Sequence, residues 1–252
     1  MNVGLVSISF RSLTPQEILR ECHAAGVAGV EWGGDKHVPH TAPERGREVL
    51  RMTTDHDLSV VCYGSYYRCG VSEDAGLAFN QVLETALALD APAIRVWVGA
   101  SGSDSTSPSE RQEILDDLRR ITELAAAEGI RICAEKHDKT LTDTDAATRD
   151  VMETLDHSAF RMLWQPTHGA SLEENLVTLD LCRPRLENLH VFHWWPTAKD
   201  RQPLVEGEER WKAYLNRARG HADWALLEFF REDKVPQFHR DARTLIAWLE
   251  AG

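Results

Sequence analysis

Four polar side chains of metal-binding type each close a short apolar run in the second half of the chain. They are Glu135 after ICA, Gln165 after RMLW, His190 after ENL and Glu228 after ALL. Two carboxylates, an imidazole and an amide oxygen make a plausible ligand set for a divalent cation, and no thiolate stands among them. We therefore predict one divalent metal ion, with Mn²⁺ as first choice and Mg²⁺, Co²⁺ or Zn²⁺ as alternatives.

Each of these residues also has an ordinary structural interpretation. Glu135 and Glu228 can be strand-end carboxylates paired to Arg or Lys, and His190 can be a hydrogen-bonded core histidine. The four together favour a site, because charged residues are rarely buried inside a barrel without a partner.

The segments that must position these residues alternate between short β-branched or aromatic runs and longer stretches of helical periodicity. This alternation is typical of βαβ units and a parallel sheet. The length of 252 residues suits one large domain, so residues 1–252 are expected to form a single unit. Eight strands are expected, at 3–8, 28–32, 58–63, 93–98, 130–135, 160–165, 186–192 and 224–229.

Helix boundaries have recognisable signals between these strands. Thr14, Ser107 and Ser171 each precede a Glu by three residues, which is a capping box, and Gly26 and Gly129 suit left-handed helix ends. Eight strands and eight helices predict a (β/α)8 TIM barrel, with a doubly wound open sheet as the alternative. That alternative lacks its usual support, because no GxGxxG follows the first strand and no GxxxxGK[ST] occurs. In a barrel, catalytic groups stand at the carboxyl ends of the strands, where the four residues lie.

Composition limits the partners and the compartment. The formal net charge of −12 disfavours nucleic acid, and no apolar run is long enough to cross a bilayer. The five cysteines form no CxxC pair and the first residues form no signal-peptide pattern, so a cytoplasmic protein is expected. A small neutral substrate fits the negative net charge better, and a nonphosphorylated one is expected because no phosphate-cradling glycine loop follows the last two strands. A homo-oligomer is compatible with the fold.

Several segments together resemble a branch of the xylose isomerase-like TIM barrel superfamily, the sugar isomerase/epimerase family. The resemblance covers essentially the whole chain and is carried by GVEWGGDKHVPH, VVCYGSYYR, AEKHDKTLTDT, LWQPTHG, NLHVFHWW and ALLEFF. It implies a metal held by Glu135, Gln165, His190 and Glu228, although Gln165 stands where the family usually has Asp. Two Glu ligands neutralise a divalent cation, whereas Glu, Asp and Glu leave one negative charge in excess. With Gln165, the metal should therefore be a stronger Lewis acid, but more weakly held, than in a shell with three carboxylates. Alternatively, Gln165 binds substrate and water completes the shell.

The same resemblance implies that Glu135 and Glu228 are catalytic. In the family, one Glu removes a proton next to a sugar carbonyl to give a cis-enediolate, and the other returns a proton on the opposite face. His168 corresponds to the family histidine that hydrogen-bonds a substrate hydroxyl. Further candidates for substrate binding are pocket polar groups or aromatic wall residues, each of which can instead serve turns or packing: His37, Tyr63, Trp97, Lys136, His137 and His193.

These features lead to a metal-dependent isomerase or epimerase of a ketose or keto-sugar as the first hypothesis. The alternative is a dehydratase or 3-keto-glycoside lyase that uses the same proton abstraction, with Lys136, His137 or His193 protonating the leaving group. A DNA-repair endonuclease is disfavoured by the negative charge, and a noncatalytic barrel has Gln165 as its only support.

Overall fold

The strands close into a parallel barrel in the computed structural model, which describes residues 1–251. Within that range, the order around the barrel is β1-β10-β7-β6-β5-β4-β3-β2. The predicted (β/α)8 fold is confirmed, and residue 252 of the expected single domain lies outside the described residues. The barrel strands are β1 (Asn2–Val6), β2 (Gly29–Gly33), β3 (Ser59–Arg68), β4 (Ala93–Trp97), β5 (Arg131–Glu135), β6 (Phe160–Trp164), β7 (Leu186–Val191) and β10 (Trp224–Leu227).

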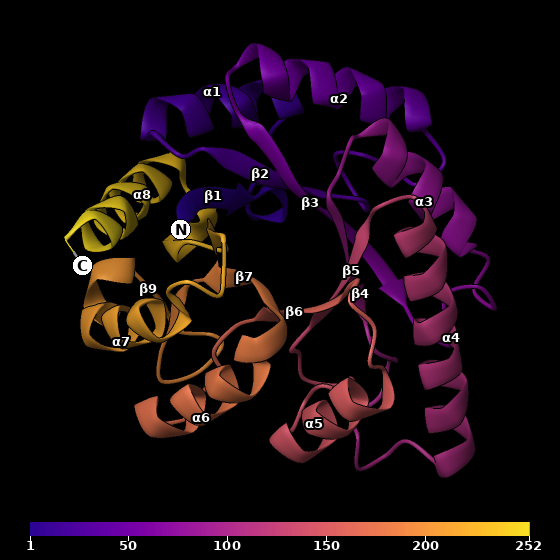
Figure 1. Ribbon diagram of the computed structural model, residues 1–252. Helices are drawn as coiled ribbons and strands as arrows, with labels where there is room; N and C mark the ends of the chain where they lie inside the picture. Colours follow the sequence, from indigo (N-terminus) through magenta and orange to yellow (C-terminus); the bar gives the residue numbers. More distant parts are fainter. Residues whose placement is uncertain (252) are drawn as a thin grey trace.

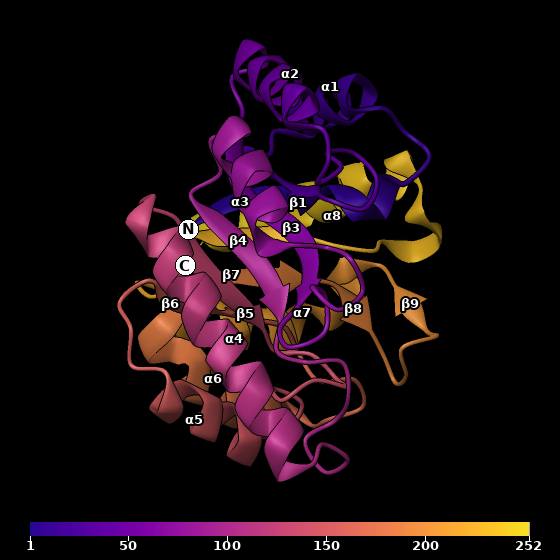
Figure 2. The same cartoon turned by 90° about the vertical axis from the view of Figure 1, so that its right-hand side faces the viewer.

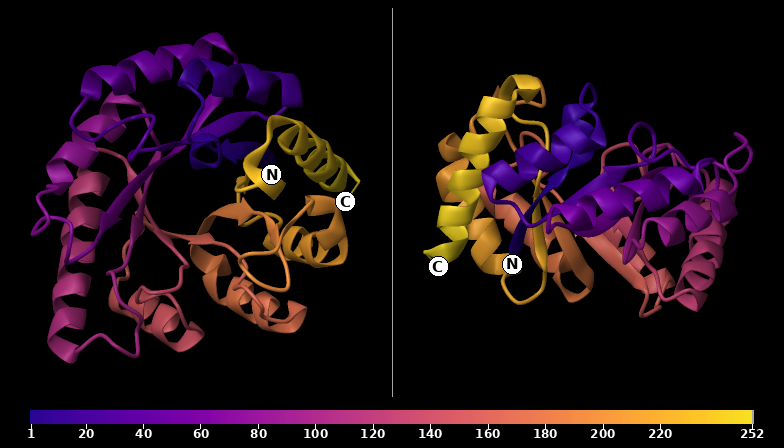
Figure 3. Two further views of the ribbon diagram at one scale, coloured as in Figure 1. Left: turned by 180° about the vertical axis from the view of Figure 1, so that it is seen from behind. Right: turned by 90° about the horizontal axis from the view of Figure 1, so that it is seen from above.

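Helices surround the strands as an outer ring (Figure 1). The predicted capping boxes at Thr14, Ser107 and Ser171 are present, and Gly26 and Gly129 adopt φ angles of 74° and 75°. These caps satisfy amide groups that a helix end leaves unpaired. The ring consists of α1 (Pro15–Ala25), α2 (Pro43–Asp55), α3 (Phe79–Ala88), α4 (Pro108–Ala127), α5 (Asp145–Thr154), α6 (Leu172–Cys182), α7 (Glu208–Ala218) and α8 (Val235–Glu250). The view from behind shows the same ring (Figure 3, left).

Side-chain alternation along the strands separates two apolar regions. On β5, Ile132 and Ala134 belong to the large core between strands and helices, whereas Cys133 belongs to a smaller cluster inside the barrel. Successive side chains of a strand point to opposite faces, so Glu135 shares the inner face with Cys133. All five cysteines are buried, free thiols.

Two segments differ from the sequence prediction. Strand β3 continues to Arg68, past the expected end at residue 63, with a register shift between Gly64 and Tyr67 and a positive φ of 56° at Tyr66. The connection after β7 contains a two-stranded hairpin, β8 (His193–Trp194) and β9 (Arg201–Gln202). Strands this short carry no periodicity that could predict them. Figure 2 shows the hairpin on the side of the barrel away from the start of β1.

Across residues 1–251, no helix combines the length and apolarity that crossing a bilayer requires.

Candidate active site

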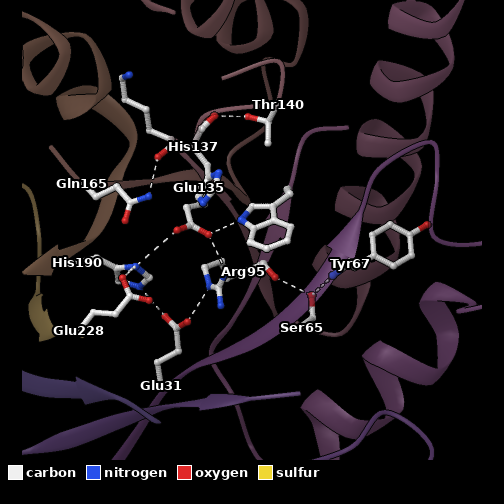
Figure 4. A network of polar contacts seen from close by, with 12 residues as sticks. Glu31, Ser65, Tyr67, Arg95, Glu135, His137, Thr140, Gln165, His190 and Glu228 are labelled. Carbon is white, nitrogen blue, oxygen red and sulfur yellow. Dashed lines mark hydrogen bonds and ion pairs between the residues drawn. The ribbon is translucent and has the colours of Figure 1, made fainter. Parts of the chain in front are cut away.

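Five ionisable side chains meet inside the barrel at the carboxyl ends of its strands (Figure 4). We call them the mouth cluster. At most 9% of any of these side chains is exposed, so their charges must be compensated by one another or by a ligand. The cluster consists of Glu31 on β2, Arg95 on β4, Glu135 on β5, His190 on β7 and Glu228 directly after β10.

Arg95 links two of the carboxylates. Its Nε donates to Oε1 of Glu31 at 2.7 Å, and its Nη1 donates to Oε2 of Glu135 at 2.6 Å. That Glu135 oxygen also accepts from Nε1 of Trp97 at 2.5 Å. Burial raises the pKa of Glu135, but the Arg95 guanidinium together with His190 and His137 outweighs it, and the net shift is downward. Glu135 is therefore held as an anion, with one oxygen occupied.

Space for this arrangement comes from Gly64 on the neighbouring strand. A Cβ at this position would lie 2.8 Å from Oε1 of Glu31 and 2.9 Å from Nη2 of Arg95. Contacts this short do not occur in folded proteins, so a side chain at residue 64 would displace the ion pair.

His190 lies between the three carboxylates. Its Nε2 is 3.2 Å from Oε2 of Glu31, while its Nδ1 is 3.3 Å from Oε2 of Glu228 and 3.7 Å from Oε1 of Glu135. Burial lowers the pKa of His190, but Glu228 and Glu31 outweigh it and raise the pKa to about 10. Among the described residues, Nδ1 has no hydrogen-bond partner.

The mouth cluster fits a divalent cation in charge and in geometry. Residues 1–251 contain no preformed group of three His, Cys, Asp or Glu ligands. However, three carboxylates outnumber the guanidinium by two negative charges, of which a protonated His190 compensates one, and the buried Nδ1 of His190, without a hydrogen-bond partner, faces two carboxylate oxygens. Ligand atoms around one cation lie about 3 to 3.5 Å apart when the metal bonds are about 2.1 Å long. Glu135, His190 and Glu228 are thus the residues that could hold such a cation.

Gln165 adjoins this set through its amide. Its Nε2 donates to the backbone carbonyl of Lys136 at 3.2 Å. A carbonyl only accepts, so this bond fixes the amide with Oε1 on the other side, toward His190 in Figure 4. The oxygen is suitably placed for either expected role, in the metal shell or on substrate.

A cavity of about 250 Å³ opens above the mouth cluster. Rings line two of its sides: Trp97 packs against Tyr66 and His137, with centroids 5.4 and 5.1 Å apart, and His168 stacks on Trp194 at 4.8 Å. The lining residues are Ile8, Arg11, Tyr66, Arg95, Trp97, Glu135, His137, Gln165, His168, Phe192, Trp194, Glu228 and Phe229. This size and mixed lining suit a small cyclic molecule.

The structure brings most of the predicted residues to this cavity and places four elsewhere. Glu135, Gln165, Glu228, Trp97, His137 and His168 line it, and His190 lies beneath it. Tyr63 donates to the carbonyl of Val38 at 2.8 Å, and His37 contacts Ser7 Oγ at 3.0 Å. Lys136 is directed toward Thr167 Oγ1 at 3.3 Å, because it follows Glu135 on the opposite face. His193 packs on Gly207, in a separate small cavity.

Arg95 is the main site residue that sequence reasoning missed. It stands in the apolar run AIRVWV, within the strand expected at residues 93–98. Strand alternation offered a signal, because Arg95 and Trp97 are two residues apart and share a face. A charge on the inner face of a barrel needs partners, which would have pointed to Glu31 and Glu135.

Comparisons with known proteins agree with this architecture. Residues 19–252 match the family model described as xylose isomerase-like TIM barrel, and the chain belongs to this family. A 3-dehydroshikimate dehydratase of Bacillus anthracis is 25% identical over 260 residues, covering 91% of each protein.

Solved structures extend the comparison. The Bacillus anthracis protein AsbF, a 3-DHS dehydratase candidate involved in petrobactin synthesis, has a TM-score of 0.82 at 22% identity, over 98% of this chain and 99% of that one. The IOLI protein with a bound zinc atom has a TM-score of 0.78 at 14% identity, over 100% and 99%. The Escherichia coli 3-keto-D-glucoside 4-epimerase YcjR has a TM-score of 0.72 at 18% identity, over 100% of both chains. Identities this low support the shared fold, and the relatives include both a dehydratase and an epimerase.

Proposed function

We propose that this protein is a divalent-metal-dependent dehydratase of a small cyclic keto-polyol. It removes a proton next to the carbonyl and eliminates the β-hydroxyl as water. The observation that carries the proposal is the unequal environment of the two glutamates that the family resemblance makes proton carriers. Glu135 has one oxygen bound by Arg95 and Trp97 and the other turned toward His190, whereas Glu228 lines the cavity beside His190 alone.

One available carboxylate suits elimination better than epimerisation. Epimerisation needs a proton carrier on each face of the reacting carbon, while elimination needs one base and a proton donor for the leaving group. In the proposed reaction Glu228 takes the proton, and the electron pair of the broken C–H bond is delocalised onto the carbonyl as an enolate. When the carbonyl re-forms, that electron pair makes the C=C bond to the β carbon as the β C–O bond breaks, and the C–O electron pair leaves with the oxygen.

His137 is the proposed donor to that oxygen. Of the three donors considered from the sequence, His137 lines the cavity, whereas Lys136 and His193 point elsewhere. The proton that His137 gives to the departing hydroxyl completes a molecule of water. The ring of Trp97, 5.1 Å away, supports the imidazole against the cavity wall.

The cation would be held by Glu135, His190 and Glu228, with Gln165 as a fourth ligand or as a substrate contact. When bound, it polarises the substrate carbonyl and stabilises the negative charge that develops on its oxygen. The chain's own contribution is to orient these ligands and to surround the substrate with the rings of Tyr66, Trp97, Phe192 and Trp194. Mn²⁺ remains our first choice.

The test is product analysis with purified protein and Mn²⁺ on a panel of cyclic keto-polyols that includes 3-dehydroshikimate, the substrate in the name of the curated relative. We expect a product lighter by one water, and turnover slowed by about 10³-fold in Glu228→Gln. An isomer of unchanged mass would instead support a ketose or keto-sugar epimerase, the second candidate, which the likeness to a 3-keto-D-glucoside 4-epimerase favours. Absence of any product over the panel, with or without metal, would contradict both candidates.

A further inference from the structure

Glu31 and Arg95 are buried charges that the proposed reaction does not use. Their side chains are 0% and 3% exposed. Desolvating two charges is unfavourable unless each is fully paired, and apolar residues fill the layer beneath, including Ala93, Cys133 and Leu163. The pair therefore calls for an explanation beyond packing.

The two residues connect the proposed metal ligands to each other. Arg95 divides its donors between Glu31 and Glu135, and Glu31 divides its oxygens between Arg95 and His190. The result is a chain from Glu135 through Arg95 and Glu31 to His190. Its two ends face each other, with Oε1 of Glu135 3.7 Å from Nδ1 of His190.

We propose that Glu31 and Arg95 are positioning residues that set the cation affinity of the mouth cluster in opposite directions. The inference rests on the proposed function, because it concerns the cation of that site. Glu31 strengthens binding, since its oxygen accepts the Nε2 proton of His190 and leaves Nδ1 as the nitrogen that gives up its proton and directs its lone pair at the cation. Arg95 weakens binding, since its positive charge repels the cation and its bond to Glu135 restricts that ligand to one oxygen.

Opposite effects of the Glu31 and Arg95 substitutions on cation affinity distinguish this role from a merely structural one. In Glu31→Gln, the amide has one oxygen for two donors, Arg95 and His190, so its NH₂ group meets one of them. Where it faces His190, Nε2 must become an acceptor and the proton moves to Nδ1, which can then no longer bind a cation. In Arg95→Met, a positive charge is lost and both oxygens of Glu135 become available.

The experiment is a titration of the metal-free protein with Mn²⁺. Binding is measured by calorimetry and by the electron paramagnetic resonance signal of free Mn²⁺. Neither readout depends on turnover. We expect Glu31→Gln to bind Mn²⁺ about 10- to 100-fold more weakly than wild type. We expect Arg95→Met to bind Mn²⁺ at least about tenfold more tightly than wild type. Arg95→Lys keeps the charge, so its Mn²⁺ affinity should stay within about threefold of wild type.

The matched control is Glu187→Gln. Glu187 is also a carboxylate shared between two cationic groups, Arg131 at 2.6 Å and Arg161 at 3.1 Å, but it lies near the start of β7, at the other end of the barrel. The Glu187→Gln variant should bind Mn²⁺ with the affinity of wild type. Should Arg95→Met fail to fold, Arg95→Gln removes the same charge and keeps amide donors.

Weaker binding in both the Glu31 and the Arg95 variants, with wild-type binding intact, would overturn the inference and leave the proposed function standing. A wild-type protein that binds no Mn²⁺ and forms no dehydrated product would overturn the proposed function, and the inference with it.

Discussion

Two groups of charged residues, at opposite ends of the same barrel, differ in how completely their charges are paired. The rear cluster, Arg131, Arg161 and Glu187, has two guanidinium groups around one carboxylate, and the side chains of the two arginines are 38% and 32% exposed. Solvent can compensate its excess positive charge. The mouth cluster has three carboxylates for one guanidinium, is almost fully buried and leaves Nδ1 of His190 without a partner among the described residues.

The comparison shows which kind of charge network indicates function. A network whose charges are satisfied by one another or by water is explained by stability alone. A buried network that retains excess charge and an unpaired donor or acceptor needs a further component, here the proposed cation.

The largest difference between the clusters should be in turnover. Glu228→Gln removes the proposed base but keeps the shape of the side chain, so dehydration should slow by about 10³-fold. Glu187→Gln in the rear cluster should turn over like wild type. Initial rates with saturating Mn²⁺ measure both, and equal losses in the two variants would remove the functional distinction between the clusters.

The next largest difference between the clusters should be in the free energy of unfolding, measured with urea. Arg95→Leu leaves two buried carboxylates without their cation, which should cost about 3 to 5 kcal/mol of the free energy of unfolding. Arg131→Leu breaks a half-exposed pair and should cost about 1 kcal/mol or less. Similar losses for the two variants would mean that the mouth cluster is no more tightly coupled than a surface network.

The hydrogen bond of Trp97 to Glu135 offers a smaller effect. Trp97→Phe keeps an aromatic ring in the cavity wall but removes the Nε1 donor, so kcat should fall by about tenfold. The control is Trp164→Phe, which removes the bond from Nε1 to Thr178 Oγ1 on the outer face of the barrel. It should reduce stability and leave kcat unchanged; a normal kcat in Trp97→Phe would show that Arg95 alone fixes Glu135.

The smallest expected change comes from Gln165→Asp, which restores the residue usual in the family. An added carboxylate near the cation should tighten Mn²⁺ binding by about fivefold, because affinity rises with the charge of the ligands. Mn²⁺ titration measures it. Unchanged affinity would place Gln165 outside the metal shell and favour its alternative role on substrate.

The fold could be predicted from sequence because its signals are local. Strand runs, Thr14, Ser107 and Ser171 as helix caps, and Gly26 as a helix end each depend on a few neighbouring residues. The ends of the last strands also placed Glu135 and Glu228 correctly at the barrel mouth.

The network around these residues could not be predicted in the same way. The pairing of Arg95 with Glu31 joins positions 64 residues apart, and that of His190 with Glu31 joins positions 159 apart. Which neighbours meet depends on strand tilt and register across the closed barrel, and local patterns do not specify these. His37, Tyr63, Lys136 and His193 were proposed for their polar or aromatic character, but loop geometry and strand alternation direct them away from the cavity.

The absence of a side chain at Gly64 has a consequence for how this pocket can change. Because a Cβ there would press on both Glu31 and Arg95, a larger residue at 64 must displace one of these side chains or be accompanied by a smaller residue at 31 or 95. The effects of substitutions at the three positions therefore depend on one another, and a library that varies them separately would discard combinations that work only together. Laboratory evolution of a new specificity in this barrel should randomise residues 31, 64 and 95 together.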